Sequence, residues 1–138
     1  MKVCIVENDQ MLRDSMILFF RTKGCAVQAY PNAEEAFQAF INLPPDIVVC
    51  DQNLPGMDGL EFLVHVGARH RDMVRILIDA YPNGRFAEKA KQAGIEEYLL
   101  KPFSIEEIER VMERRLSTRT NGTRPKGGAD EDPNQGFG

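Results

Sequence analysis

The sequence predicts an α/β fold in which helices cover both faces of a five-stranded parallel sheet. Short apolar runs rich in β-branched residues alternate five times with longer stretches of helical period. The apolar runs are mostly continuous, as is typical of strands buried on both faces. With 138 residues, 43% of them hydrophobic, the chain can form one such domain and is too short for two.

The predicted strands are short runs of aliphatic and β-branched residues between polar or glycine-containing segments. They are Val3–Val6, Cys25–Ala29, Ile47–Cys50, Val74–Ile78 and Tyr98–Leu100. Three of them contain the cysteines, Cys4, Cys25 and Cys50. An odd number of cysteines without short-range spacing fits neither a disulfide framework nor a zinc knuckle, so we interpret them as small hydrophobic strand residues.

The predicted helices carry apolar residues at three- and four-residue spacing. The apolar positions are Leu12, Met16, Phe19 and Phe20 in the first helix, Ala36, Phe37, Phe40 and Ile41 in the second, and Leu60, Leu63, Val64 and Gly67 in the third. The fourth and fifth helices are predicted at Phe86–Ala93 and Ile105–Leu116.

Capping residues support these helix boundaries. Two helix starts have an acceptor followed three residues later by a glutamate, which is the spacing of a capping box: Asn32 with Glu35, and Ser104 with Glu107. Gly24 and Gly94 stand where the first and fourth helices should end.

Apolar periodicity stops after about Ser117, and the last stretch is rich in glycine and proline. Such a segment cannot bury enough surface to order itself. We therefore expect a compact domain over residues 1–116 and a flexible, disordered tail over residues 117–138.

Charge and hydropathy limit the partners. The chain has 17 basic and 21 acidic residues and a net charge of -4, which gives no general reason to bind nucleic acid or an anionic membrane. No apolar run approaches the roughly 20 residues that span a bilayer, and no signal peptide precedes the first strand, so we expect a cytoplasmic protein. We interpret the basic residues near the end as helix-dipole or solvated side chains: Arg110, Arg114, Arg115, Arg119, Arg124 and Lys126.

Polar side chains follow four of the five predicted strands. In an open parallel sheet, ligands bind beyond the carboxyl ends of the strands. The residues at these ends are Glu7, Asn8 and Asp9 after the first strand, Asp51 after the third, Asp79 after the fourth, and Lys101 with Pro102 after the fifth. Acidic groups that converge with one lysine form a site suited to a hard cation and a phosphoryl group.

Two motifs carry a family resemblance. The segment Pro45–Gly59 reads PDIVVCDQNLPGMDG, and Tyr98–Phe103 reads YLLKPF. Both closely resemble bacterial response-regulator receiver domains, and the resemblance extends over about residues 2–116 in one register. It implies a flavodoxin-like (CheY-like) doubly wound fold with strand order 2-1-3-4-5 and five helices.

The resemblance also implies roles for the residues at the strand ends. Asp51 would be the phosphoacceptor that forms an aspartyl phosphate, and Lys101 would contact a phosphoryl oxygen. Glu7, Asp51 and the backbone carbonyl of Asn53 would hold Mg²⁺, with Asn8 as a weak ligand.

Further positions belong to the switch and to the backbone. Asp79 stands where the family has a switch Ser or Thr, and Tyr98 stands at the aromatic rotamer switch. Pro102 would follow a cis peptide. Gly59 is expected to let the loop after Asp51 turn into the third helix.

The function that follows is a single-domain receiver in a two-component phosphorelay, which is not an enzyme beyond its own phosphorylation. A sensor histidine kinase or a phosphotransfer protein would supply the phosphoryl group. Output would use the fourth helix, fifth strand and fifth helix, at Gly84–Leu116, and a homodimer is compatible with this reading. An aspartate-nucleophile phosphatase would require a second aspartate where Asn53 stands. A flavin carrier would require a phosphate-binding loop after the first strand.

Two departures from the family pattern predict weak phosphorylation. Asn8 replaces a carboxylate that normally binds the metal directly, which weakens the attraction for Mg²⁺. Asp79 replaces a hydroxyl donor with an acceptor that would be repelled by a phosphorylated Asp51, and it can pair with Lys101 instead. The alternative is a phosphorylation-independent pseudo-receiver that acts only through protein contacts.

Overall fold

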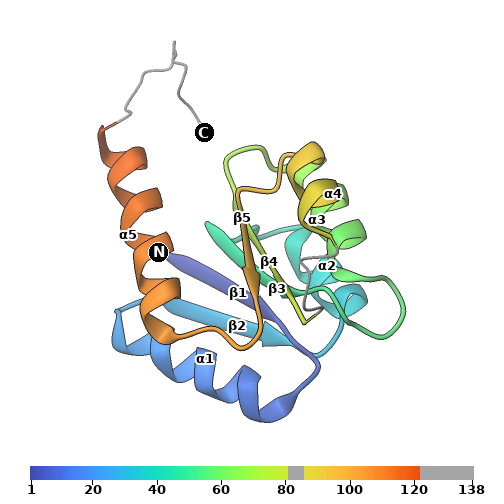
Figure 1. Ribbon diagram of the computed structural model, residues 1–138, viewed down its shortest axis with the longest axis horizontal. Helices are drawn as coiled ribbons and strands as arrows, with labels where there is room; N and C mark the ends of the chain where they lie inside the picture. Colours follow the sequence, from blue (N-terminus) through green and yellow to red (C-terminus); the bar gives the residue numbers. More distant parts are fainter. Residues whose placement is uncertain (81–85, 122–138) are drawn as a thin grey trace. The chain divides into compact units, whose positions relative to one another are not determined.

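A computed structural model describes residues 1–80 and 86–121 of the chain, with side chains up to Arg115 (Figure 1). The chain divides into two units, Met1–Pro102 and Phe103–Gly138, and each is described by itself. All the residues proposed for the site from the sequence belong to the first unit.

Five strands of the first unit form one parallel sheet. They are β1 (Lys2–Val6), β2 (Ala26–Tyr30), β3 (Ile47–Asp51), β4 (Val74–Asp79) and β5 (Glu97–Leu100). The sheet order is β2-β1-β3-β4-β5, which confirms the predicted doubly wound topology. Cys4 and Cys50 are buried strand residues as expected, but Cys25 precedes β2 and is only half-buried.

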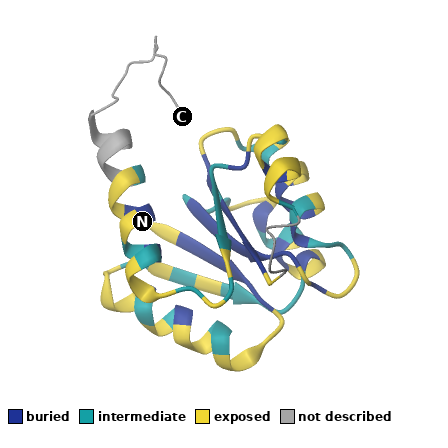
Figure 2. Ribbon diagram, viewed as in Figure 1, coloured by how far each residue is buried: buried dark blue, intermediate teal, exposed yellow. Residues whose placement is uncertain are grey.

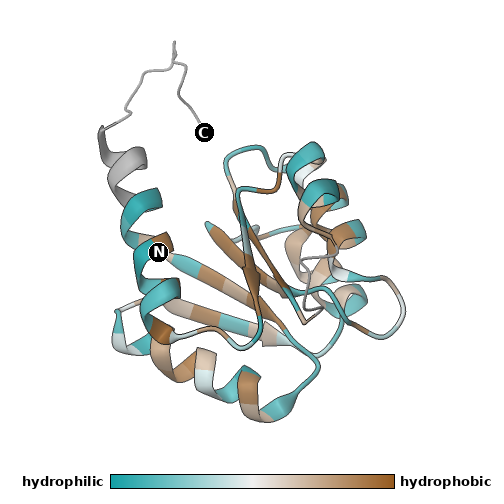
Figure 3. Ribbon diagram, viewed as in Figure 1, coloured by the Kyte–Doolittle hydropathy of each residue, from teal (hydrophilic) through white to brown (hydrophobic). Residues whose placement is uncertain are grey.

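Four helices of the first unit cover the sheet. They are α1 (Gln10–Thr22), α2 (Ala33–Phe40), α3 (Gly59–Arg69) and α4 (Ala87–Gln92). Figure 1 shows α1 on one side of the sheet and the other three on the opposite side. β1, β3 and β4 are the most deeply buried strands (Figure 2) and consist mainly of hydrophobic residues (Figure 3). Their apolar side chains form the core together with buried residues of the helices, such as Phe40 and Phe62.

Three helix starts are fixed by carboxylate or amide side chains. Asp9 accepts from the backbone N–H groups of the first turn of α1, and Asn32 does so for α2. Asp58 accepts from the N–H of Glu61 at 2.9 Å and thereby caps α3. These bonds satisfy N–H groups that have no partner inside the helix, and they therefore determine the residue at which each of the three helices begins.

The second unit contains helix α5 (Ile105–Asn121). The predicted capping box is present: Ser104 accepts from the Glu107 N–H at 3.2 Å, and Glu107 accepts from the Ser104 N–H at 3.4 Å. The predicted helix end at Leu116 is wrong, because residues 117–121 continue the helix without apolar periodicity. The rest of the predicted tail, residues 122–138, lies outside the described residues. Within the described part of the chain, no helix has the length and apolarity required to cross a membrane.

Candidate functional site

The carboxyl ends of four neighbouring strands meet at one edge of the sheet. Strand register brings them together: Val6 pairs with Cys50, Asp51 with Ile78, and Asp79 with Leu100. Glu7 and Lys101 are the next residues after β1 and β5. Parallel strands of matched length therefore deliver side chains that are more than ninety positions apart in the sequence to the same edge.

Lys101 lies between two carboxylates at this edge. Its ammonium nitrogen is 3.4 Å from Asp51 Oδ1 and 3.6 Å from Glu7 Oε1. The Glu7 and Asp51 side chains are 1% and 4% exposed, whereas the Lys101 side chain is 26% exposed. The lysine thus reaches from the surface onto two buried acids. The peptide bond between Lys101 and Pro102 is cis.

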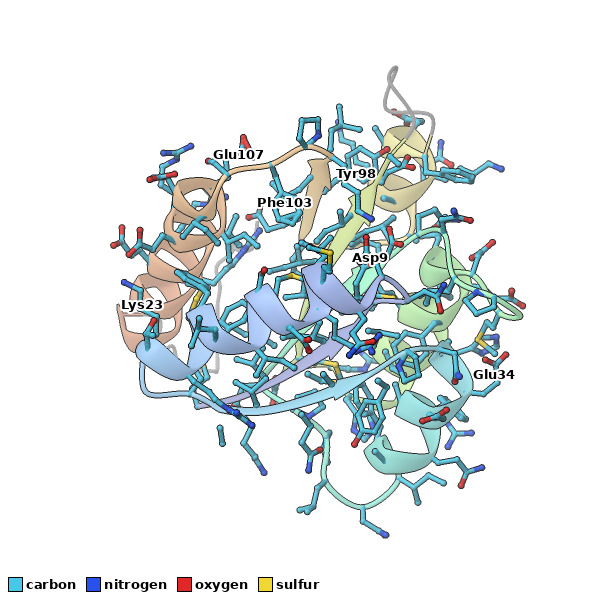
Figure 4. All side chains as sticks on the ribbon, turned by 90° about the horizontal axis from the view of Figure 1, so that it is seen from below. Asp9, Lys23, Glu34, Tyr98, Phe103 and Glu107 are labelled. Carbon is cyan, nitrogen blue, oxygen red and sulfur yellow. The ribbon has the colours of Figure 1, made fainter. Side chains whose placement is uncertain are left out.

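Asp79 has a different partner from the one considered in the sequence analysis. It is fully buried and accepts a hydrogen bond from the Tyr98 hydroxyl. The Tyr98 hydroxyl in turn accepts from the Phe86 N–H at 3.4 Å, and Phe86 is the N-cap residue of α4. Lys101 forms its ion pairs with Asp51 and Glu7. Asp79 instead links β4, through the Tyr98 hydroxyl, to β5 and to the start of α4. Figure 4 labels Tyr98, on β5.

Burial dominates the electrostatics of the Glu7 and Asp51 pair. It raises the pKa of both carboxyl groups, because the charged form loses its hydration, and the Asp51 charge raises the pKa of Glu7 further. Lys101 opposes these effects by lowering both pKa values. One ammonium facing two carboxylates leaves the pocket with an excess of negative charge.

This charge excess predicts a pH-dependent stability. A carboxyl group whose pKa is raised by folding binds its proton more tightly in the folded chain, so the free energy of unfolding falls as pH rises through the folded-state pKa. We expect urea denaturation to show this decrease above about pH 4.5, the ordinary range of these groups. Asp51→Asn is expected to flatten the profile and to stabilise the protein at neutral pH by on the order of 1 kcal/mol. Parallel profiles for the two proteins would contradict this reading.

The pocket has some features of a site for a hard cation. Glu7 Oε1 and Asp51 Oδ1 are buried and, within the described structure, accept no hydrogen bond, and carboxylate oxygens are the ligands that Mg²⁺ prefers. Nevertheless, residues 1–80 and 86–121 contain no group of three or more His, Cys, Asp or Glu side chains placed to hold a metal. The residues present thus supply two carboxylates, and the next residue after Glu7 is Asn8, which is exposed and has a neutral amide side chain.

Close contacts between backbone atoms fix the loop after Asp51. The N–H of Gly59 donates to the Gln52 carbonyl at 3.1 Å, and a Cβ at Gly59 would lie 2.2 Å from the Asp51 carbonyl oxygen. The buried Gln52 side chain accepts from the Leu60 N–H at 2.8 Å. Gly59 is therefore needed because α3 begins directly against the end of β3.

Glu34 and Gln52 were missed by the sequence analysis. Glu34, labelled in Figure 4, lies in the first turn of α2, and its carboxylate accepts from the Met57 N–H at 3.0 Å. This backbone hydrogen bond lowers the pKa of Glu34. Gln52 directly follows Asp51, so its place beside the site could have been predicted from the sequence. The contact of Glu34 could not, because Glu34 is 23 residues from Met57 and no short-range pattern connects the two.

Arg13 was also missed, and it fixes the end of β1. Its guanidinium donates to the backbone carbonyls of Glu7 at 2.7 Å and Asn8 at 3.3 Å. The Glu7 carboxylate also accepts from the Asp9 N–H at 3.1 Å. Asp9 therefore serves as the N-cap of α1 and does not replace the carboxylate that is missing at Asn8.

The family follows from a sequence match that covers most of the chain. The sequence profile described as "Response regulator receiver domain" matches residues 3–113. The chain belongs to this family. Receiver domains are signalling domains of two-component response regulators.

Curated relatives of this receiver chain are longer regulators. The two-component response regulator PhoP of Pseudomonas aeruginosa is 31% identical over 109 residues, which cover 79% of this chain and 48% of the relative. The DNA-binding transcriptional regulator NtrC of Escherichia coli is 30% identical over 124 residues, which cover 90% of this chain and 26% of the relative. The chain thus spans about a quarter to a half of the length of these relatives.

Solved structures agree with the receiver fold. The receiver domain of NtrX from Brucella abortus superposes with a TM-score of 0.77 at 25% identity, covering 84% of this chain and 98% of that one. A CheY-like receiver from Methanospirillum hungatei gives a TM-score of 0.79 at 23% identity, covering 88% and 98% of the two chains. The second likeness shows the fold alone.

Proposed function

We propose that this receiver accepts a phosphoryl group on Asp51. The proposal is supported by one observation above all: the Lys101 ammonium lies 3.4 Å from Asp51 Oδ1, at the end of a buried strand. The ammonium is then in place to contact a phosphoryl oxygen and to stabilise the negative charge that develops during transfer. Site residues and family membership thus support the same chemistry.

In the proposed reaction, a carboxylate oxygen of Asp51 attacks the phosphorus of a phosphohistidine or of a small phosphodonor. A new O–P bond forms as the bond from phosphorus to the leaving group breaks. The imidazole that leaves a phosphohistidine takes up a proton from solvent, whereas acetate leaves acetyl phosphate as the anion. Glu7, Asp51 and the carbonyl of Asn53 would hold Mg²⁺, with Asn8 as a weak contributor. Bound Mg²⁺ would neutralise charge on the phosphoryl oxygens.

We also propose the partners and place of action. A sensor histidine kinase or phosphotransfer protein in the cytoplasm would supply the phosphoryl group, and a protein partner would bind the proposed output face within Gly84–Leu116. Part of the proposed face, at residues 84 and 85, lies outside the described residues. DNA binding is named for NtrC, and we expect it to require parts of that relative that this chain does not match.

A second candidate function is a phosphorylation-independent interaction module. It is favoured by the hydrogen bond between Tyr98 and Asp79, because the residue at the switch position is already engaged in the unphosphorylated chain. Under this function the same face would bind its partner, and Asp51 would remain unmodified.

Labelling with a small phosphodonor tests the first function. We expect acetyl phosphate with Mg²⁺ to add one phosphoryl group slowly, and intact-mass spectrometry should detect the mass increase. Asp51→Asn should remove the signal, whereas Asp46→Asn, which changes a carboxylate at the opposite end of β3, should retain it. Labelling of Asp51→Asn at the wild-type rate, or no labelling of the wild type by any donor, would refute the assignment.

A further inference from the structure

The Asp79 and Tyr98 pair joins three elements of the first unit: β4, β5 and the start of α4. Asp79 ends β4, Tyr98 lies on β5, and Phe86 caps α4. The Tyr98 hydroxyl donates to the Asp79 carboxylate and accepts from the Phe86 N–H, so one oxygen atom makes both contacts. The start of α4 is therefore connected through Tyr98 to a fully buried carboxylate at the sheet edge.

The chemistry of this pair favours a permanent contact. A hydrogen bond from a phenol to a carboxylate is stronger than one between two hydroxyl groups, because the acceptor carries a charge. Burial and the bond to Asp79 raise the pKa of Tyr98 to about 12, so the hydroxyl keeps its proton at neutral pH. The Tyr98 ring also packs against the apolar core, which fixes its orientation from the other side.

Phe86 gives α4 a reason to depend on this contact. The N-cap side chains of α1, α2 and α3 are Asp9, Asn32 and Asp58, which all carry oxygen acceptors, whereas a phenylalanine side chain has none. The Tyr98 hydroxyl, which comes from β5, accepts from the N–H of the N-cap residue itself, so it holds the backbone where α4 begins without replacing the missing side-chain cap.

We propose that Asp79 and Tyr98 act as a clamp that holds the start of α4 in one arrangement whatever the state of Asp51. Asp79 and Asp51 end neighbouring strands, and a phosphoryl group on Asp51 would repel the Asp79 carboxylate and not draw it inward. Asp79 then keeps its bond to Tyr98. The inference rests on the proposed function in one respect: it treats the face of α4 and β5 as the surface that binds the partner. The clamp would keep this surface in the same arrangement with and without a phosphoryl group on Asp51.

The clamp is tested without any phosphoryl group. Protein labelled with 3-fluorotyrosine contains three fluorine sites, at Tyr30, Tyr81 and Tyr98, which Tyr→Phe variants assign. A soluble gadolinium chelate should broaden the Tyr98 signal of the wild type only in part, because the ring is half-buried against the core. The Tyr30 signal, from a tyrosine that is also half-buried, is the reference that Asp79→Thr should leave unchanged. Asp79→Thr, which restores the family residue, should increase the broadening at Tyr98, because the aromatic ring is then free to turn outward.

Amide exchange of α4 provides the second readout. We expect Asp79→Ala and Tyr98→Phe each to accelerate exchange in Ala87–Gln92 by about tenfold, and the double variant to exchange no faster than either, because both remove the same contact. Asp79→Asn retains an acceptor oxygen and should change exchange least, while Tyr30→Phe is the remote control. If Asp79→Ala does not fold, Asp79→Thr takes its place.

Two results would overturn the clamp: a Tyr98 signal that is equally accessible in the wild type and in Asp79→Thr, or additive effects of the Asp79 and Tyr98 substitutions on α4. Neither measurement involves Asp51. A failure to phosphorylate Asp51 would therefore leave the clamp standing, and loss of the clamp would leave the phosphoacceptor proposal standing.

Discussion

The combined substitution of Asn8→Asp and Asp79→Thr is expected to lower the Mg²⁺ concentration needed for half-maximal labelling of Asp51 by about 30-fold. The new carboxylate lies beside Glu7, at the end of β1, and even a net gain of ~2 kcal/mol in cation binding corresponds to this factor. Threonine replaces a carboxylate that would repel the phosphoryl group with a hydroxyl that can donate to it. Labelling should therefore also become faster at saturating Mg²⁺.

The Mg²⁺ titration needs a control for added charge. Gln10→Glu places a carboxylate two residues from Asn8, at the exposed first turn of α1, and should leave the half-maximal Mg²⁺ concentration unchanged. Asn8→Asp alone should provide most of the gain in Mg²⁺ affinity, and Asp79→Thr alone should mainly affect the labelling rate. An unchanged titration in the double variant would mean that the cation site is not limited by Asn8.

Gly59→Ala is expected to destabilise the fold by about 3 kcal/mol or more. The added Cβ would lie 2.2 Å from the Asp51 carbonyl oxygen, 2.8 Å from its carbonyl carbon and 2.9 Å from the Gln52 Cα. These are backbone atoms of a buried strand end, which cannot move aside as the tip of a flexible side chain can. Thermal unfolding should show a decrease in Tm of about 10 °C or more.

Gly24→Ala is the matched control for Gly59→Ala. Gly24 has φ +82, and a Cβ there would meet no atom within 4 Å. The substitution should cost only the strain of a left-handed alanine, about 1 kcal/mol. An equal loss of stability in the two variants would show that α3 can shift away from β3, and the argument from close backbone contact would then fail.

The excess of carboxylates over ammonium groups links stability and chemistry at this edge. Glu7 and Asp51 are almost fully buried with one shared lysine, an arrangement that weakens the folded state and at the same time creates attraction for a cation. The same charges therefore explain the expected stabilisation by Asp51→Asn and the expected response to Mg²⁺. Arg13 contributes by holding the backbone carbonyls of Glu7 and Asn8.

The sequence by itself determined the elements, their order and the residues at the strand ends. Helical period, capping pairs such as Asn32 with Glu35, and the end-of-helix position of Gly24 depend on neighbours a few residues away, so they can be read along the chain. The helix end at Leu116 was missed because α5 continues to Asn121 without apolar periodicity, and periodicity was the signal used.

Only the tertiary structure decided which charged groups pair. From residue types, Lys101 could pair with any of three acids. In the folded chain, the strand register and the side-chain lengths place Lys101 near Asp51 and Glu7, and Asp79 accepts a hydrogen bond from Tyr98. Contacts such as Glu34 with Met57 join positions with no local relation. The physical reason is that the strength of an ion pair or a hydrogen bond changes when the distance between its atoms changes by a few tenths of an ångström. Such small differences in distance arise from packing and leave no pattern in the sequence.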